Sequence, residues 1–410
     1  MRVWAFPSIY PYDYEGMSWF GIFAHRQYKQ LIEIGADLTV IIPILWYPPF
    51  PFSQLHPDWK YLAKYHYPKK RVYDGITVYH PRIYNMRPNR FVKKTYSERC
   101  IDSITNFFKD NKIELDPAKD IFFSQWLPDA AFVQQAAHRL GVKSAILGIG
   151  DDILVYPYAK EDNFNTFKKT LLEADLRLTN ADYLGKEANK IIGMNLPFET
   201  IYFEVNCDFF KPASPENIEL IKKEYNIPVG KVIILTVGSS IIRKGWLDLF
   251  DALKEVKKVN ENFLLVGVHA GSPEFDFTKE IDTRGLTSNF LNIGEIKPAS
   301  LNRLYNAADI FCLPSHWEGL ATVVIEAMAS GLPVITTNVC GHPEIINSGV
   351  SGVLVPSKQP EILTKELLNL INDEEKRKQM GENARNFIVS KFGPGNTQRL
   401  YKLLENTLSK

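Results

Sequence analysis

The chain has 410 residues, 45% of them hydrophobic, and its 48 basic residues are nearly balanced by 47 acidic ones. This length exceeds what one hydrophobic core usually supports and predicts two domains, while a net charge of +1 excludes a chain-wide surface for polyanions. The four cysteines form no CxxC pair and no run of about 18 apolar residues occurs, so we expect a soluble, cytoplasmic protein without a zinc site.

In the first half of the chain, short apolar runs alternate with longer segments of helical period. A helix is expected over residues 21–35, and buried strands are expected over 36–44, 119–124, 142–149 and 176–181. This alternation is typical of a parallel α/β sheet.

The same pattern restarts after residue 207. Strands are expected over 231–238, 263–268, 309–314 and 331–337, with a helix that begins at Trp246. We therefore predict two Rossmann-like, doubly wound α/β domains over 1–207 and 208–394.

An amphipathic segment, 395–410, follows a Pro/Gly break and is expected to pack back on the first domain. Ligands of open α/β sheets bind outside the carboxyl ends of the strands, so we expect the two domains to face each other across a cleft.

A first candidate loop is "GSSIIRKG" (238–245), which follows a strand and opens a helix. Gly238 lets the backbone approach a ligand, Ser239 adds a hydroxyl, and Arg243 and Lys244 add positive charge. Together with helix amides, these groups indicate a phosphate site. The alternative is a helix start whose basic side chains point into solvent. Neither GxGxxG nor the Walker A pattern is present.

A second candidate loop is "PSHWEGLAT" (314–322), which also ends a strand and leads into a helix. Thr322 is predicted to be the N-cap, so that the positive end of the helix favours an anion. Glu318 lies in the loop and Glu326 lies one turn into the helix, where their carboxylates suit the hydroxyls of a ribose and a sugar. The alternative is that Glu326 complements the helix dipole and Glu318 is a solvated loop residue.

The segment from 313 to 355 resembles the signature of retaining glycosyltransferases of family 4, which is Glu, seven residues, Glu, then G-x-P-V and G-x-x-E-I-I. Glu318 and Glu326 match the pair, and Gly341 and Glu344 match the last segment. Further stretches, "FPSIYPYDYEGMSWFG", "SQWLPDAA", "GDDI" and "EVNCDFFKP", resemble other segments of the family. The resemblance implies the two-domain GT-B fold and transfer of a sugar from a nucleotide donor with retention of anomeric configuration.

The resemblance also implies roles for individual residues. Lys244 takes the position of the lysine that contacts the donor diphosphate, Glu326 that of the ribose ligand, and Glu318 that of the contact to the transferring sugar or its phosphate. The backbone at Gly319, Leu320, Ala321 and Thr322 would hold phosphate or sugar hydroxyls, and Gly16 or Gly21 would let the facing loop approach the donor. The implied organisation is an acceptor domain over 1–207 and a donor domain over 208–394.

Two departures from the family pattern stand out. Ser239 occupies the place where many members have an arginine, and Arg243 is the candidate replacement. Where many members have "HGxD", this chain has Ile149, Gly150, Asp151 and Asp152. We therefore assign no catalytic histidine and keep Asp152 as a candidate cleft residue.

The expected mechanism needs neither metal nor cofactor. Departure of the diphosphate leaves negative charge that Lys244, Arg243 and a helix terminus can stabilise, and the donor loops contain no DxD motif. The resemblance suggests front-face substitution, in which a donor phosphate oxygen takes the acceptor proton. Glu318 as a nucleophile is the alternative.

Residues 60–94 hold ten Lys or Arg, seven aromatic residues and one acid, Asp74. This composition suits peripheral contact with an anionic membrane that carries a lipid-linked acceptor, and it also suits a solvated basic edge. A nucleic-acid partner is not expected, since no binding motif accompanies the charge.

The leading interpretation is a retaining glycosyltransferase that builds a polysaccharide or surface glycan. A nucleotide-sugar epimerase or a glycosyl phosphorylase with the same fold is the alternative within enzymes. A non-catalytic subunit that binds a sugar nucleotide is the alternative outside them.

Overall fold

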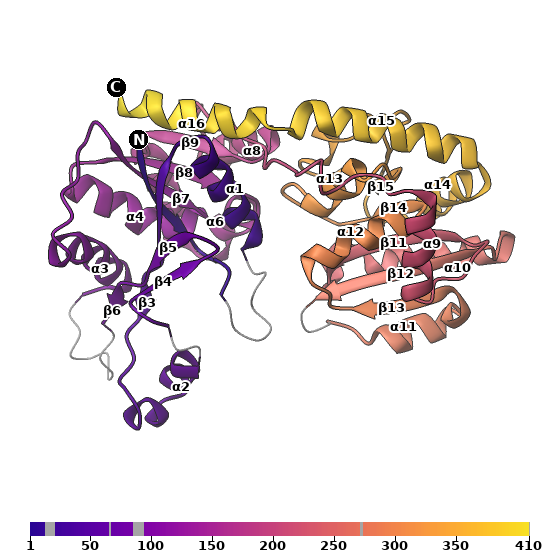
Figure 1. Ribbon diagram of the computed structural model, residues 1–410, viewed down its shortest axis with the longest axis horizontal. Coiled ribbons are helices and arrows are strands. Elements are labelled where there is room, and N and C mark those ends of the chain that lie inside the picture. Colours follow the sequence, from indigo (N-terminus) through magenta and orange to yellow (C-terminus); the bar gives the residue numbers. More distant parts are fainter. Residues whose placement is uncertain (13–20, 65–66, 85–93, 271–273, 410) are drawn as a thin grey trace. The chain divides into compact units, whose positions relative to one another are not determined.

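The computed structural model describes residues 1–12, 21–64, 67–84, 94–270 and 274–409. The chain forms two compact units (Figure 1). Unit 1 comprises Met1–Phe203 and Gly395–Lys410, and unit 2 comprises Glu204–Pro394. The chain therefore passes from unit 1 to unit 2 after Phe203, rather than after residue 207, and returns at Gly395.

Within the described residues, unit 1 is built on an eight-stranded sheet. Its neighbouring strands are parallel except for β4 and β5, which are antiparallel. In spatial order the strands are β10 (Glu199–Thr200), β9 (Leu176–Thr179), β8 (Lys143–Gly148), β7 (Asp120–Gln125), β1 (Arg2–Pro7), β2 (Asp37–Ile41), β5 (Ile76–Tyr79) and β4 (Lys70–Tyr73). A short parallel pair, β3 (Ile44–Leu45) and β6 (Arg82–Ile83), lies apart from this sheet.

Helices cover both faces of the unit 1 sheet. Adjacent residues of a strand point to opposite faces, and in β7 Phe122 packs on Phe108 of one face while Phe123 packs on Tyr28 of the other. The helices of unit 1 are α1 (Ile22–Glu33), α2 (Pro57–Lys64), α3 (Tyr96–Asp110), α4 (Leu127–Arg139), α5 (Asp151–Leu154), α6 (Tyr156–Ala159), α7 (Glu161–Glu173), α8 (Asp182–Ile192) and α16 (Gly395–Leu408), with the 3-10 turn η1 (Phe52–Leu55).

The helix expected over 395–410 is α16, and it completes the core of unit 1. Leu400 and Leu404 are fully buried in the same hydrophobic cluster as Tyr28 of α1. Arg399 on α16 forms an ion pair of 2.7 Å with Glu199 at the start of β10. The last segment of the chain therefore covers the same face of the sheet as α1 (Figure 1).

Unit 2 is built on a six-stranded parallel sheet, counted over the described residues. In spatial order the strands are β13 (Phe290–Gly294), β12 (Phe263–Ala270), β11 (Val232–Ser239), β14 (Ile310–Leu313), β15 (Val334–Thr337) and β16 (Val353–Val355). When the strands are numbered along the chain from β11, this order is 3-2-1-4-5-6, that of a Rossmann fold. Successive strands are added on one side of β11 as far as β13, and from β14 onward they are added on its other side. Ligands of such sheets bind at this switch point.

Helices also flank the unit 2 sheet. They are α9 (Pro215–Glu224), α10 (Trp246–Val259), α11 (Phe277–Thr283), α12 (Pro298–Ala307), α13 (Thr322–Ala329), α14 (Pro360–Asn372) and α15 (Glu374–Phe392), with the 3-10 turns η3 (Ile242–Lys244), η4 (Thr287–Asn289) and η5 (His342–Glu344). The helix predicted to begin at Trp246 is confirmed as α10, and its Leu249, Phe250 and Leu253 are fully buried in the unit 2 core.

The expected strands and helices of both halves are present, with small shifts at their ends. The strands β1, β4, β5, β6, β10, β13 and β16 were not expected, and the expected strand 36–44 is divided between β2 and β3. In β4, the strand at the edge of the sheet, Lys70 and Arg71 interrupt the apolar pattern. No helix in the described parts of the chain has the length and apolar character needed to span a membrane.

Candidate functional site

The two predicted ligand loops of unit 2 leave neighbouring strands. One follows β11 and leads through η3 into α10, and the other follows β14 and leads into α13. Since β11 and β14 pair in parallel, with Ile234 opposite Ile310, both loops emerge at the same edge of the sheet. The structure thus brings the two predicted loops together at the switch point of the sheet.

The two loops are in close backbone contact at Gly245 of the first loop and Pro314 of the second. Gly245 has a φ of 75°, and a Cβ atom added there would lie 1.9 Å from the carbonyl oxygen of Pro314. The amide of His316 donates to the carbonyl oxygen of Arg243 at 2.7 Å, and the His316 ring contacts Asp248 at 2.8 Å. The end of the first loop is therefore fixed against the start of the second.

Lys244 and Glu318, predicted to contact the same donor, form an ion pair with each other. Lys244 Nζ lies 2.5 Å from Glu318 Oε2, and both side chains are largely buried, with 12% and 14% of their area exposed. Burial raises the pKa of the Glu318 carboxyl, but Lys244 and Arg243 outweigh this effect and hold that pKa below its ordinary value. Glu318 is therefore a carboxylate at neutral pH. The alternative that it is a solvated loop residue is wrong, because its side chain is largely buried.

Arg243 lies beside this pair. Its guanidinium carbon is 5.8 Å from the centroid of the Trp317 ring, and its charge contributes to the low pKa of Glu318. Arg243 thus places a further guanidinium group beside the Lys244–Glu318 pair. The alternative of a cation directed only into solvent does not fit this arrangement.

The first loop is shaped by its backbone. The carbonyl oxygen of Ser239 accepts a hydrogen bond from Trp246 Nε1 at 3.0 Å, and Ser239 itself is exposed. A Cβ at Gly238 would meet the side chain of Lys244 at 3.6 Å, which is ordinary contact, so a glycine is not required there by packing. Its proposed purpose, close approach to a ligand, stays a prediction.

Helix α13 starts one residue earlier than predicted. Its N-cap is Ala321, which offers no side-chain hydrogen bond, and the exposed Thr322 is the first helical residue. The prediction of Thr322 as N-cap is therefore wrong, because the loop reaches helical geometry at Thr322 itself. Gly319, Leu320 and Ala321 are buried behind the loop surface.

Glu326 is held by a tyrosine that the sequence did not single out. Glu326 is buried, and Tyr305 on α12 donates its hydroxyl hydrogen to Glu326 Oε2 at 3.1 Å. The hydrogen bond fixes the orientation of the carboxylate within the first two turns of α13. Tyr305 is fully buried, and its place on the apolar face of a helix gave no signal beyond core packing.

His342 is a second residue that sequence reasoning missed. It is fully buried, and its Nδ1 donates to the carbonyl oxygen of Thr337 at 3.1 Å, which leaves Nε2 as a bare acceptor. Nε2 has no hydrogen-bond partner among the described residues. Burial lowers the pKa of His342, although Glu318 opposes this, so the ring is neutral beside the Lys244–Glu318 pair. The motif match drew attention to Gly341 and Glu344, on either side of it.

Two glycines of unit 1, Gly16 and Gly21, were predicted to let a loop approach the donor. Gly16 lies outside the described residues. Gly21 precedes α1 with a φ of 74°, and a Cβ there would lie 2.3 Å from the carbonyl oxygen of Ile9, so a glycine is required by packing within unit 1. Contact of either glycine with a donor stays a prediction.

Asp152 is fully buried between the loops that follow β7 and β8. It accepts hydrogen bonds from the backbone amides of Leu127, Ile149 and Gly150, at 2.7 to 3.1 Å for the shortest contact to each. Burial raises the pKa of this carboxyl to about 6, although these bonds oppose the shift. The observed contacts of Asp152 hold two loops together, and contact with a ligand stays a prediction.

Comparison with known proteins places this geometry in context. Residues 217–387 match the family model "Glycosyl transferases group 1". A Bacillus subtilis protein described as a teichuronic acid biosynthesis glycosyltransferase, TuaC, is 23% identical over 412 residues, which cover all of this chain and 99% of TuaC.

Solved structures show the same fold over the full length. A sucrose-phosphate synthase from Thermosynechococcus elongatus superposes with a TM-score of 0.78 at 15% identity and covers 100% of both chains. Anabaena HepE in complex with UDP superposes with a TM-score of 0.72 at 16% identity and covers 99% of this chain and 100% of its own. The fold is thus the GT-B fold, as predicted.

Proposed function

We propose that this chain, of which residues 217–387 match the model of the glycosyl transferases group 1 family, is a retaining glycosyltransferase that moves a sugar from a nucleoside diphosphate donor to a glycan or lipid-linked acceptor. The observation that carries this proposal is the meeting of Lys244, Glu318 and Arg243 at the switch point of the unit 2 sheet. Unit 2 holds the donor in this proposal, and unit 1 holds the acceptor. The complex of HepE with UDP supports such a donor, and the described role of TuaC supports a surface glycan as the product.

The site suits the charge that develops when the sugar leaves the diphosphate. A diphosphate gains negative charge as the anomeric bond breaks, and prepositioned cations and helix amides stabilise that charge. Arg243 and Lys244 lie on one loop, and the first-turn amides of α13 lie at the start of the neighbouring helix. These groups supply the stabilisation without a metal ion, so we propose a metal-independent reaction.

The Lys244–Glu318 ion pair bears on the stereochemical course. A carboxylate that already accepts a charged hydrogen bond at 2.5 Å is a weaker nucleophile than a free one. The pair therefore favours front-face substitution over a covalent intermediate on Glu318. In this course Glu318 orients Lys244, and a phosphate oxygen of the donor takes the proton from the acceptor hydroxyl.

The proposal is tested first by calorimetric titration with UDP, GDP and ADP and with their common sugar conjugates, with and without a chelator. We expect one nucleotide to bind selectively and to resist chelation. Incubation of the preferred conjugate then separates the alternatives, because an epimerase releases an altered sugar without an acceptor and a phosphorylase requires inorganic phosphate. Absence of binding by every nucleotide and conjugate would contradict the proposal.

Replacing Glu326 by alanine is expected to weaken nucleotide binding at least about tenfold, because the ribose hydroxyls lose the carboxyl oxygens as hydrogen-bond partners. Tyr305→Phe removes only the hydroxyl that orients Glu326 and is expected to give a smaller loss in the same direction. Both effects are measured as dissociation constants by calorimetry.

Glu382→Ala is the matched control, since Glu382 is an exposed glutamate on α15 in the same unit. It is expected to bind the nucleotide as the unmodified chain does. Equal affinity of Glu326→Ala and Glu382→Ala would remove Glu326 from the donor site.

A further inference from the structure

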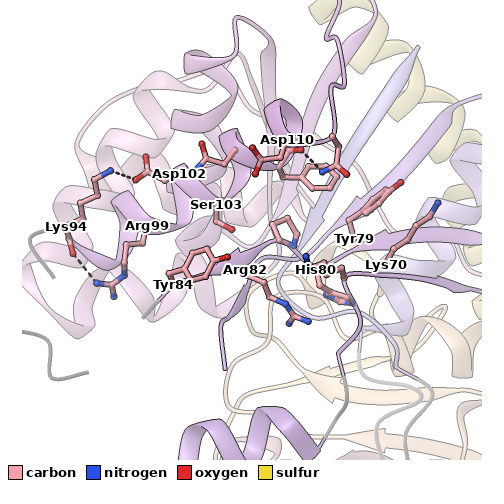
Figure 2. A pocket seen from close by; sticks show the side chains of 15 residues that line it. Lys70, Tyr79, His80, Arg82, Tyr84, Lys94, Arg99, Asp102, Ser103 and Asp110 are labelled. Atoms are coloured by element: carbon pink, nitrogen blue, oxygen red, sulfur yellow. Dashed lines mark hydrogen bonds and ion pairs between the residues drawn. The ribbon is translucent and has the colours of Figure 1, made fainter. Parts of the chain in front are cut away.

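A pocket of about 720 Å³ lies in unit 1, between the edge of its sheet and α3. Figure 2 shows Arg99 and Ser103 of α3 on one side, and Tyr79 of β5 and Lys70 of the edge strand β4 on the other. We call it the α3 pocket. Its volume falls in the range of sites for small molecules, about 300 to 1,000 Å³.

Positive charge dominates the lining of the α3 pocket. Two carboxylates, Asp102 and Asp110, line it, and five cations do so: Lys69, Lys70, Arg82, Lys94 and Arg99. Asp102 is already paired with Lys94 at 2.6 Å and with Arg139 at 3.2 Å. In the described part of the chain, no carboxylate lies within ion-pairing distance of the other four cations, which are Lys69, Lys70, Arg82 and Arg99.

Three polar atoms of the lining are buried without a partner. Over the described residues, Arg82 Nη1, Arg99 Nε and Ser103 Oγ are inaccessible to solvent and make no hydrogen bond. Ser103 as a whole is only 8% exposed. A buried donor left unsatisfied is costly, and these three belong to side chains that line one pocket. An acceptor group bound in the pocket would satisfy them once the side chains turn toward it.

The positive charge does not depend on histidine. His80 Nδ1 donates to the carbonyl oxygen of Ile42 at 3.3 Å, and Nε2 accepts from Arg71 Nε at 3.1 Å, so the ring is neutral. Burial and the charge of Arg71 lower the pKa of His80 to about 4, in agreement with these contacts. Guanidinium and ammonium groups therefore supply the field of the pocket.

The aromatic residues narrow the class of ligand. Tyr79, Tyr84 and Phe107 line the same pocket, and Lys70 Nζ lies 5.4 Å from the centroid of the Tyr79 ring. Rings with an apolar face and a polar tip suit a ligand that combines hydroxyls with an apolar face, as a sugar does. Guanidinium groups match the geometry of phosphate and carboxylate oxygens.

We propose that the α3 pocket binds an acidic sugar through its phosphate or carboxylate group, with Arg82, Arg99 and Ser103 turning toward the oxyanion and donating to it. The pocket lies in unit 1 and shares no residue with the predicted donor site. Given the proposed glycosyl transfer, on which this step rests, the acidic sugar belongs to the acceptor.

The test is calorimetric titration of the full chain with glucose 1-phosphate, glucuronate and glucose. Arg99→Gln removes one charge and one unsatisfied donor from the pocket, and Lys109→Gln removes one charge from the exposed side of the same helix. We expect at least one of the two acidic sugars to bind the unmodified chain and Lys109→Gln alike, and to bind Arg99→Gln about tenfold more weakly or worse. Glucose is expected to bind much more weakly than that acid.

Ser103→Ala keeps the charge of the pocket and is expected to lower the same affinity several-fold. Equal affinity of Arg99→Gln and Lys109→Gln, or no binding of either acid, would overturn the proposal. Vesicles of phosphatidylglycerol and of phosphatidylcholine separate the two sources of a phosphate group. Binding to the anionic vesicles that depends on Arg99, without binding of the soluble acids, would overturn the sugar assignment and identify a lipid headgroup.

Titration with the preferred nucleotide keeps the two proposals apart. Its affinity is expected to be unchanged in Arg99→Gln, because the donor site lies in unit 2. If Arg99→Gln loses affinity for the acidic sugar but not for the nucleotide, the result supports the α3 pocket as a separate site. If no nucleotide binds the unmodified chain, the result contradicts the proposed glycosyl transfer, and the affinity of the α3 pocket for the acidic sugar still stands as measured.

Discussion

Replacing Lys244 by alanine is expected to lower the rate of nucleotide release from the donor by at least about 100-fold and to weaken nucleotide binding. Removal of one prepositioned group that stabilises a developing anion typically costs about 10² to 10³ in turnover. Lys244 also neutralises the largely buried Glu318, so its loss leaves a carboxylate without its cation. The measurement is the rate of release from the conjugate that binds, together with thermal unfolding of the same variant.

A paired variant separates chemistry from stability. Lys244→Met combined with Glu318→Gln removes both charges at once, and we expect it to unfold at a higher temperature than Lys244→Ala but to stay as slow in turnover. Lys254→Ala, an exposed lysine on α10, serves as the control and should match the unmodified chain. Normal turnover in Lys244→Ala would falsify the assignment of Lys244 to the leaving group.

Replacing Gly245 by alanine is expected to lower the free energy of unfolding by about 3 kcal/mol or more. The left-handed backbone at Gly245 costs an alanine about 1 to 2 kcal/mol, and a Cβ 1.9 Å from the carbonyl oxygen of Pro314 forces the two site loops apart. Unfolding in urea measures the stability, and calorimetry should show weaker nucleotide binding by the folded fraction.

Gly285→Ala is the matched control in the same unit. Its φ of 66° is also left-handed, but no atom lies within 4 Å of the added Cβ, so only the backbone term of about 1 to 2 kcal/mol is expected. The difference between the two variants isolates the contact between Gly245 and Pro314. Equal losses in the two variants would show that this contact contributes nothing.

The position of the two candidate ligand loops of unit 2 was predictable from the sequence because that position follows from topology. Apolar runs of the length of β11 and β14, each followed by a glycine-containing loop and a helix, predict parallel strands whose carboxyl ends carry ligand loops. The signature that the segment 313–355 resembles then selected Glu318 and Glu326, and the wider resemblance selected Lys244. Each of these inferences depends on order along the chain, which the sequence contains.

The side-chain partners were not predictable in the same way. Lys244 and Glu318 are 74 residues apart, and nothing in either segment reveals that they pair with each other. Tyr305 lies in a segment whose apolar pattern indicates packing, and His342 lies between two residues of the motif without belonging to it. Only the three-dimensional arrangement shows that Tyr305 is bonded to Glu326 and that Nε2 of His342 has no hydrogen-bond partner among the described residues.

The α3 pocket illustrates the same limit. The basic composition of residues 60–94 was visible in the sequence, but the pocket also needs Arg99, Ser103 and Phe107 from α3. An edge strand and a helix become neighbours only through the fold. Composition therefore indicated an anion-binding region without indicating a cavity.

The return of α16 to unit 1 also affects the order in which the protein is made. The core of unit 1 needs Leu400 and Leu404, and these residues are synthesised only after every residue of unit 2. Domains generally fold as units during synthesis, from the amino terminus onward. Unit 2 is continuous in sequence, so all of its residues are synthesised before unit 1 is complete. Until α16 is synthesised, unit 1 exposes the apolar surface of α1 and the sheet that α16 covers.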